Sequence, residues 1–129
     1  MPYISDNEVE KILSSKYFNC GVHHKGEQMQ TSEFNELLAE RLKKIAETLE
    51  SKGSEYSSKS DRLHNFKSAG QMTDTTPQKA LWGMAMKHLV SVVDLLEGRL
   101  ENNRTNIDEK VGDMINYLIL LEALFEDMR

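Results

Sequence analysis

Four polar side chains share one face of a predicted C-terminal helix. Glu109 and Asp113 lie one helical turn apart, and Asn116 and Tyr117 follow on the next turn. Two carboxylates at this spacing can hold a hard cation such as Mg²⁺ through their oxygens. The same acids lie close to a helix N-terminus, where the helix dipole favours negative charge. This face is therefore a candidate metal site, with a simple capping role as the alternative.

A second polar face is predicted on the preceding helix. Lys87 and Asp94 share one side of it, and His88 lies next to them. Because a short connection favours antiparallel helices, Asp94 is expected close to the two acids of the last helix. Three carboxylates would then hold one cation, and Lys87 would reach an anionic ligand. The alternative is a solvated polar stripe with His88 at the edge of the core.

Cationic, amide and aromatic side chains also occur together in the middle of the chain. This segment contains Lys52, Tyr56, Asn65 and Phe66. Tyr56 or Phe66 could stack on a nucleobase, and Lys52 could hold a phosphate. The alternative is a surface loop with two anchoring aromatic residues, and the spacing does not separate the two interpretations.

Other catalytic and metal-binding patterns are not found in the sequence. Cys20, His23 and His24 lack the fourth ligand that a structural zinc site requires. The chain has no P-loop, no glycine-rich dinucleotide fingerprint and no nucleophile elbow. The chemistry is therefore expected in the acidic and polar helix faces.

Apolar residues at helical spacing predict the elements that position these side chains. The predicted helices span about residues 7–16, 32–52, 76–98 and 106–129, with one or two turns within 61–69. Gly53 is expected to end the second helix, and Thr76 with Pro77 to begin the third. Asn106 is expected to cap the fourth helix in a capping box with Glu109. No segment predicts a strand, so we expect an all-α helical bundle with an antiparallel C-terminal helix hairpin.

Length and charge limit the class of protein. The 129 residues and 14.8 kDa correspond to one domain. We expect residues 1–30 to form an N-terminal extension and residues 31–129 to form the helical core. The formal net charge of −5 argues against duplex nucleic acid as a partner, because binding to duplexes depends on basic contacts to phosphates.

The expected location is the cytoplasm, with no membrane contact. The first residues contain no basic stretch followed by an apolar core, as a signal peptide would. The longest apolar run, residues 117–121, is far too short to cross a bilayer. Cys20 is the only cysteine, which excludes an internal disulfide and fits a reducing compartment.

The last helix carries more apolar surface than one small bundle can cover. Its apolar residues recur at alternating spacings of four and three: Ile107, Val111, Met114, Leu118, Leu121, Phe125 and Met128. This pattern is a heptad-like seam. Residues 117–121 are apolar on every side of the helix, so a homodimer or homotetramer is predicted.

Several of these segments resemble a known family. Residues 109–118, EKVGDMINYL, resemble the acidic helix of the MazG-like, all-α nucleoside triphosphate pyrophosphohydrolases. Small phage proteins related to that superfamily show K-G-x-E/D-Y, T-P-x-x-A-L with a lysine in the helix, and D-x-x-x-Y. The corresponding elements here are residues 52–56, residues 76–81 with Lys87, and Asp113 with Tyr117. The resemblance covers roughly residues 32–129.

The resemblance implies a Mg²⁺-dependent attack of water between the α and β phosphates of a (deoxy)nucleoside triphosphate. The products would be a nucleoside monophosphate and pyrophosphate. The metal-binding and catalytic residues would be Asp94, Glu109 and Asp113. The nucleotide-binding residues would be the polar and aromatic side chains singled out above: Lys52, Tyr56, Asn65, Phe66, Lys87, His88, Asn116 and Tyr117.

Two features depart from the family pattern. MazG-like enzymes carry E-E-x-x-E on the preceding helix, whereas that helix here supplies only Asp94. Lys110 also stands where the E-x-x-D pattern has its glutamate. The first alternative is therefore a non-catalytic phage protein of the same fold that binds a nucleotide or another protein. The second is a plain helical assembly protein.

Overall fold

The chain folds into helices throughout the part that the structure describes. The computed structural model describes the backbone of residues 28–56 and 60–129, and the side chains of these residues apart from 54–56. This part contains no strand and forms α2 (Thr31–Tyr56), α3 (His64–Met72), α4 (Pro77–Leu96) and α5 (Arg104–Asp127). The predicted all-α class is confirmed, whereas the predicted helix over residues 7–16 and the zinc-like residues around Cys20 lie outside the described residues.

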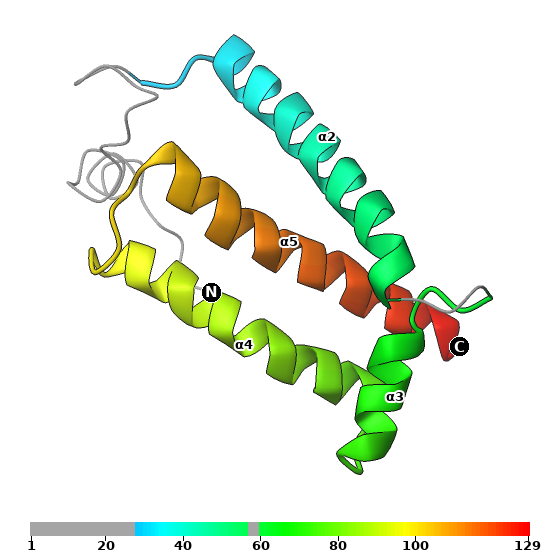
Figure 1. Ribbon diagram of the computed structural model, residues 1–129. Coiled ribbons are helices and arrows are strands. Elements are labelled where there is room, and N and C mark those ends of the chain that lie inside the picture. Colours follow the sequence, from blue (N-terminus) through cyan, green and yellow to red (C-terminus); the bar gives the residue numbers. More distant parts are fainter. Residues whose placement is uncertain (1–27, 57–59) are drawn as a thin grey trace.

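α5 lies between α2 and α4 (Figure 1). α4 and α5 run antiparallel and pack along their lengths, as the predicted C-terminal hairpin requires. α2 lies on the other side of α5 and points in nearly the same direction, while α3 packs across the first turns of α4. Polar residues on both flanks of α5 can therefore meet a neighbouring helix.

Side-chain caps set the beginnings of α4 and α5. Thr76 Oγ1 accepts a hydrogen bond from the backbone amide three residues later at 3.2 Å, and Pro77 is the first residue of α4. The predicted start of this helix is confirmed. The predicted cap of α5 at Asn106 is wrong, because Asn103 has this role. Its Oδ1 accepts a hydrogen bond from the Asn106 amide at 2.8 Å, and α5 begins directly after it.

α2 extends further along the chain than predicted. Gly53 does not end the helix, which continues to Tyr56. The guanidinium of Arg62 donates to the Leu49 carbonyl oxygen at 3.0 Å, and its Nε lies 3.3 Å from the position of a Cβ on Gly53. Arg62 therefore covers the turn at which the glycine alone predicts a helix end.

α3 and α4 meet in a tight turn. α3 occupies His64–Met72 rather than the predicted range within 61–69. A Cβ on Gly70 would lie 3.0 Å from the Pro77 nitrogen, so a larger residue would require this backbone to shift where the two helices approach. Asp74 has a φ of 52°, which reverses the chain between them.

The hydrophobic core is small. Leu63 and Phe66 pack against Leu81 and Leu124 where α3, α4 and the C-terminal half of α5 meet. Within the described residues, the buried apolar side chains are Ile45, Leu63, Phe66, Leu81, Ala85 and Leu124. The cluster attaches α3 to the helix hairpin and fixes the orientation of α5.

Large apolar side chains remain exposed on all three long helices. They include Phe34, Leu38 and Leu42 on α2, Trp82, Val90 and Leu96 on α4, Leu118 and Phe125 on α5, and Met128 directly after α5. The seam predicted along α5 is therefore partly open rather than buried in the core. None of the described helices combines the length and the apolar character needed to cross a bilayer.

Candidate functional site

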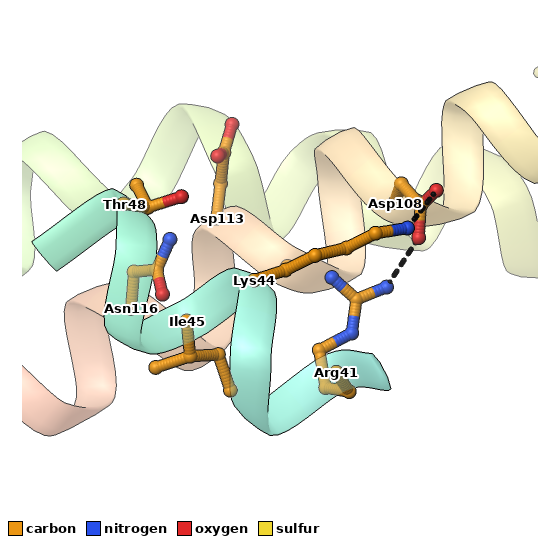
Figure 2. A pocket seen from close by; sticks show the side chains of 8 residues that line it. Arg41, Lys44, Ile45, Thr48, Asp108, Asp113 and Asn116 are labelled. Carbon is orange, nitrogen blue, oxygen red and sulfur yellow. Dashed lines mark hydrogen bonds and ion pairs between the residues drawn. The ribbon is translucent and has the colours of Figure 1, made fainter. Parts of the chain in front are cut away.

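A cleft of about 190 Å³ lies between α2 and α5. Figure 2 shows the side chains that converge on it from the two helices. Its lining residues are Arg41, Lys44, Ile45 and Thr48 from α2, and Asp108, Gly112, Asp113 and Asn116 from α5. Two of the predicted site residues, Asp113 and Asn116, therefore lie in the same cleft.

Asp108 receives three cations at one end of this cleft. Its Oδ1 accepts hydrogen bonds from Nη2 of Arg41 and from Nη2 of Arg104, each at 2.7 Å. Its Oδ2 accepts a hydrogen bond from Nζ of Lys44 at 3.0 Å. Arg41 and Lys44 come from α2, so these ion pairs connect α2 to the first turns of α5.

The cations keep Asp108 ionised. Burial raises the pKa of this carboxyl, but the hydrogen bonds from Lys44 and Arg104 outweigh burial and hold the pKa at about 2. The hydrogen bond to Asp108 raises the pKa of Lys44 in turn, with a smaller contribution from Glu40. The cluster is therefore charged at neutral pH.

The absence of a side chain at Gly112 allows Arg41 to lie against α5. A Cβ at position 112 would lie 2.6 Å from Nη1 of Arg41, which is closer than real Cβ contacts come. The glycine therefore leaves the space in which the guanidinium crosses the surface of α5 to Asp108.

Asp113 connects the cleft to the helix hairpin. Its Oδ2 lies 3.3 Å from Nδ1 of His88 on α4. The His88 ring in turn lies against the ring of Tyr117, with 5.0 Å between their centroids. The structure thus brings together three of the predicted site residues, and His88 is held between two side chains of α5.

Two uncharged polar side chains lie at the end of the cleft away from Asp108. Figure 2 shows Thr48 and Asn116 close to Asp113 at this end. The Oδ1 atom of Asn116 is buried and has no hydrogen-bond partner among the described residues. The acceptor capacity of this oxygen is unused, so a cation, a water molecule or a ligand donor could bind to it.

The three carboxylates predicted to share one metal do not converge in the structure. Asp94 accepts a hydrogen bond from Nε of Arg99 at 2.8 Å, within the turn that leaves α4. Glu109 lies 3.3 Å from Nζ of Lys110. No group of three His, Cys, Asp or Glu side chains in the described ranges could hold a metal ion. The turn after α4 directs Asp94 to Arg99 instead.

The remaining predicted ligand contacts lie away from the cleft. Phe66 is only 3% exposed and belongs to the core cluster, so stacking on a base would require it to leave that cluster. Lys52, Asn65 and Lys87 are exposed on three different helices and do not line the cleft. The side chain of Tyr56 lies outside the described residues.

Residue spacing alone does not reveal the cationic end of the cleft. Arg41 and Lys44 lie one turn apart on α2, and Arg104 and Asp108 lie one turn apart on α5. Each spacing predicts a shared helix face. Neither spacing indicates that the two faces meet, because this depends on how α2 packs against α5.

Comparisons of the chain with models of protein families, with curated proteins and with solved structures find no match. The likeness to MazG-like enzymes accordingly depends on the quoted motif residues and stays a prediction.

Proposed function

We propose that this protein binds a nucleoside triphosphate in the α2–α5 cleft and, with Mg²⁺, hydrolyses it between the α and β phosphates. The supporting observation is the lining of the cleft. Asp113 and Asn116, which belong to the motif that resembles MazG-like enzymes, share it with Arg41 and Lys44 from α2. A metal-bound triphosphate needs both oxygen ligands for its cation and cationic donors for its phosphates.

Asp113 and Asn116 are the side chains that would hold Mg²⁺. Mg²⁺ usually keeps several waters and binds through one or two carboxylates together with substrate phosphates. The carboxylate of Asp113 fits this donor set. Figure 2 shows the amide nitrogen of Asn116 on the side of Asp113, so its unpartnered Oδ1 would join the site after the amide turns over. When bound, the ion would neutralise charge on the phosphate oxygens. Asp94 and Glu109 would join the site only after release from Arg99 and Lys110.

A second candidate is a nucleotide-binding protein of the same fold without catalysis. The observation that favours it is the pairing of Asp94 with Arg99 and of Glu109 with Lys110. Both carboxylates are thereby directed to cations of the protein itself. In this case the cleft holds the nucleotide and leaves its phosphates intact.

Pyrophosphate release from a panel of nucleoside triphosphates with Mg²⁺ tests the enzyme proposal. We expect release by the wild-type chain and its loss in Asp113→Asn. Glu122→Gln is the matched control, because Glu122 is an exposed acid on the same helix and lies outside the cleft. Thermal stabilisation by a nucleotide without turnover would support the non-catalytic candidate, and the absence of both would contradict both candidates.

We further propose that the protein is a homodimer or homotetramer. The exposed apolar side chains on α2, α4 and α5 support this, because soluble monomers rarely expose large contiguous apolar patches. Light scattering coupled to size-exclusion chromatography should give a multiple of the chain mass of 14.8 kDa. A mass of one chain at micromolar concentration would contradict the proposal.

A further inference from the structure

The cations at Asp108 exceed the negative charge that they contact. Arg41, Lys44 and Arg104 share the single carboxylate of Asp108. The other acid in contact is Glu40, 3.2 Å from Lys44, whose side chain is 66% exposed and therefore strongly screened by solvent. Within residues 28–56 and 60–129, two positive charges of the cluster therefore have no acidic partner that is shielded from water.

The cluster also has a surplus of hydrogen-bond donors. A guanidinium and an ammonium together carry several more N–H groups than Asp108 has oxygens. Arg41 contacts Asp108 through Nη2, and its side chain is 15% exposed at the wall of the cleft. Thr48 lies one turn beyond Lys44 on the same wall. Phosphate groups, which are rich in acceptor oxygens and negative charge, match this set of donors.

The donors are already in place without a ligand. Asp108 holds Arg41 and Lys44 together at the cleft, and Gly112 leaves the space that Arg41 occupies. Side chains fixed in this way lose little conformational entropy when an anion binds. Asp113, the acid at the other end of the cleft, contacts His88 rather than Arg41 or Lys44.

We propose that Arg41, Lys44 and Thr48 bind the phosphate chain of a polyphosphate ligand, with Asp108 as the counter-ion that holds the two cations before the ligand arrives. The ligand class is a di- or triphosphate group, which presents several negative charges over a length that one cleft can span. This inference rests on the proposed function, because it names the side chains that take the phosphates of that nucleotide.

Calorimetric titration of inorganic tripolyphosphate into the full chain, without divalent cations, tests this site directly. We expect Lys44→Gln and Arg41→Gln each to weaken binding by about tenfold, since each removes one charge and its donors. Lys43→Gln is the matched control, because this lysine neighbours Lys44 but is 76% exposed and pairs with Glu47. Its affinity should stay within about twofold of the wild type.

Asp108→Asn should change the affinity for tripolyphosphate in the opposite direction. The asparagine keeps an acceptor oxygen for the cations but carries no charge, so tripolyphosphate binding should tighten several-fold, provided that circular dichroism shows an unchanged helix content. The inference is overturned if the wild type does not bind tripolyphosphate, or if Lys43→Gln weakens binding as much as Lys44→Gln does.

The two proposals fail in different ways. Nucleotide turnover that requires Asp113 but is unaffected by Arg41→Gln and Lys44→Gln would overturn the phosphate site and leave the proposed function intact. Tripolyphosphate binding that requires Arg41 and Lys44, without binding or turnover of any nucleotide, would support the phosphate site and overturn the proposed function.

Discussion

At the scale of single residues, Asp108 links two helices through its charge. Its pKa of about 2 lies below the ordinary value of 3.8, so the folded state favours the ionised carboxylate. A lowered pKa contributes stability above the ordinary value, and this contribution is lost as the pH falls through 3.8 towards about 2. Asp108→Asn should therefore reduce the free energy of unfolding by about 1–2 kcal/mol at pH 7.

Urea unfolding of both proteins at a series of pH values checks this prediction. The difference between wild type and Asp108→Asn should shrink steadily between pH 4 and pH 2. A difference that is the same at pH 7 and pH 2 would show that the charge of Asp108 does not stabilise the fold.

Substitution of Gly112 should change ligand binding without lowering the stability of the fold. Gly112→Ala places a Cβ 2.6 Å from Nη1 of Arg41, so the guanidinium must move, which is inexpensive because it is the end of a flexible side chain. Alanine also favours the helix by up to about 1 kcal/mol. We expect unchanged or slightly higher stability together with weaker tripolyphosphate binding, measured by thermal unfolding and calorimetry.

Gly83→Ala is the matched control for this substitution. A Cβ at position 83 meets no atom within 4 Å, so this change in α4 should stabilise the protein without affecting binding. Equal binding by Gly112→Ala and Gly83→Ala would contradict the placement of Arg41 in the phosphate site.

Residue spacing alone predicts only part of the candidate site. It indicated the polar face of α5 that contains Asp113 and Asn116, because spacing within one helix determines a shared face. It does not indicate Arg41, Lys44 and Asp108 as partners, since Asp108 is 64 and 67 residues away from the two cations and their contact depends on how the two helices pack. Spacing predicts Asp94 beside the acids of α5, because it does not show the turn that pairs Asp94 with Arg99.

At the scale of helices, the beginning of α4 depends on one hydroxyl. Thr76 Oγ1 satisfies a backbone amide in the first turn of the helix. Thr76→Ala should lower the free energy of unfolding by about 1 kcal/mol. Thr75→Ala is the control, because this neighbouring exposed threonine is not the cap. Chemical denaturation measures both, and equal losses would contradict the capping role.

Helix positions were predictable because apolar residues repeat at helical spacing, but two helix ends were not. Asn103 and Asn106 both suit a cap, and only the path of the chain decides between them. Gly53 fits a helix end in sequence, yet Arg62 from the following segment covers it. Local signals thus identify candidate ends, and tertiary contacts select among them.

At the scale of the whole molecule, the three long helices leave an extensive apolar surface. Leu118 is 49% exposed on the predicted seam of α5. In a symmetric dimer that uses this surface, Leu118→Lys would introduce two like charges at one interface. We expect the solution mass to fall towards that of one chain, measured by light scattering. Glu101→Lys, at an exposed loop position, should leave the mass unchanged.

The sparse interior has a consequence for how the protein melts. Few side chains are buried within one described chain, so folding in isolation gains little from the removal of apolar area from water. If association covers the remaining apolar area, dissociation and unfolding become one coupled equilibrium. The midpoint of thermal denaturation should then rise with protein concentration, because mass action favours the assembled state.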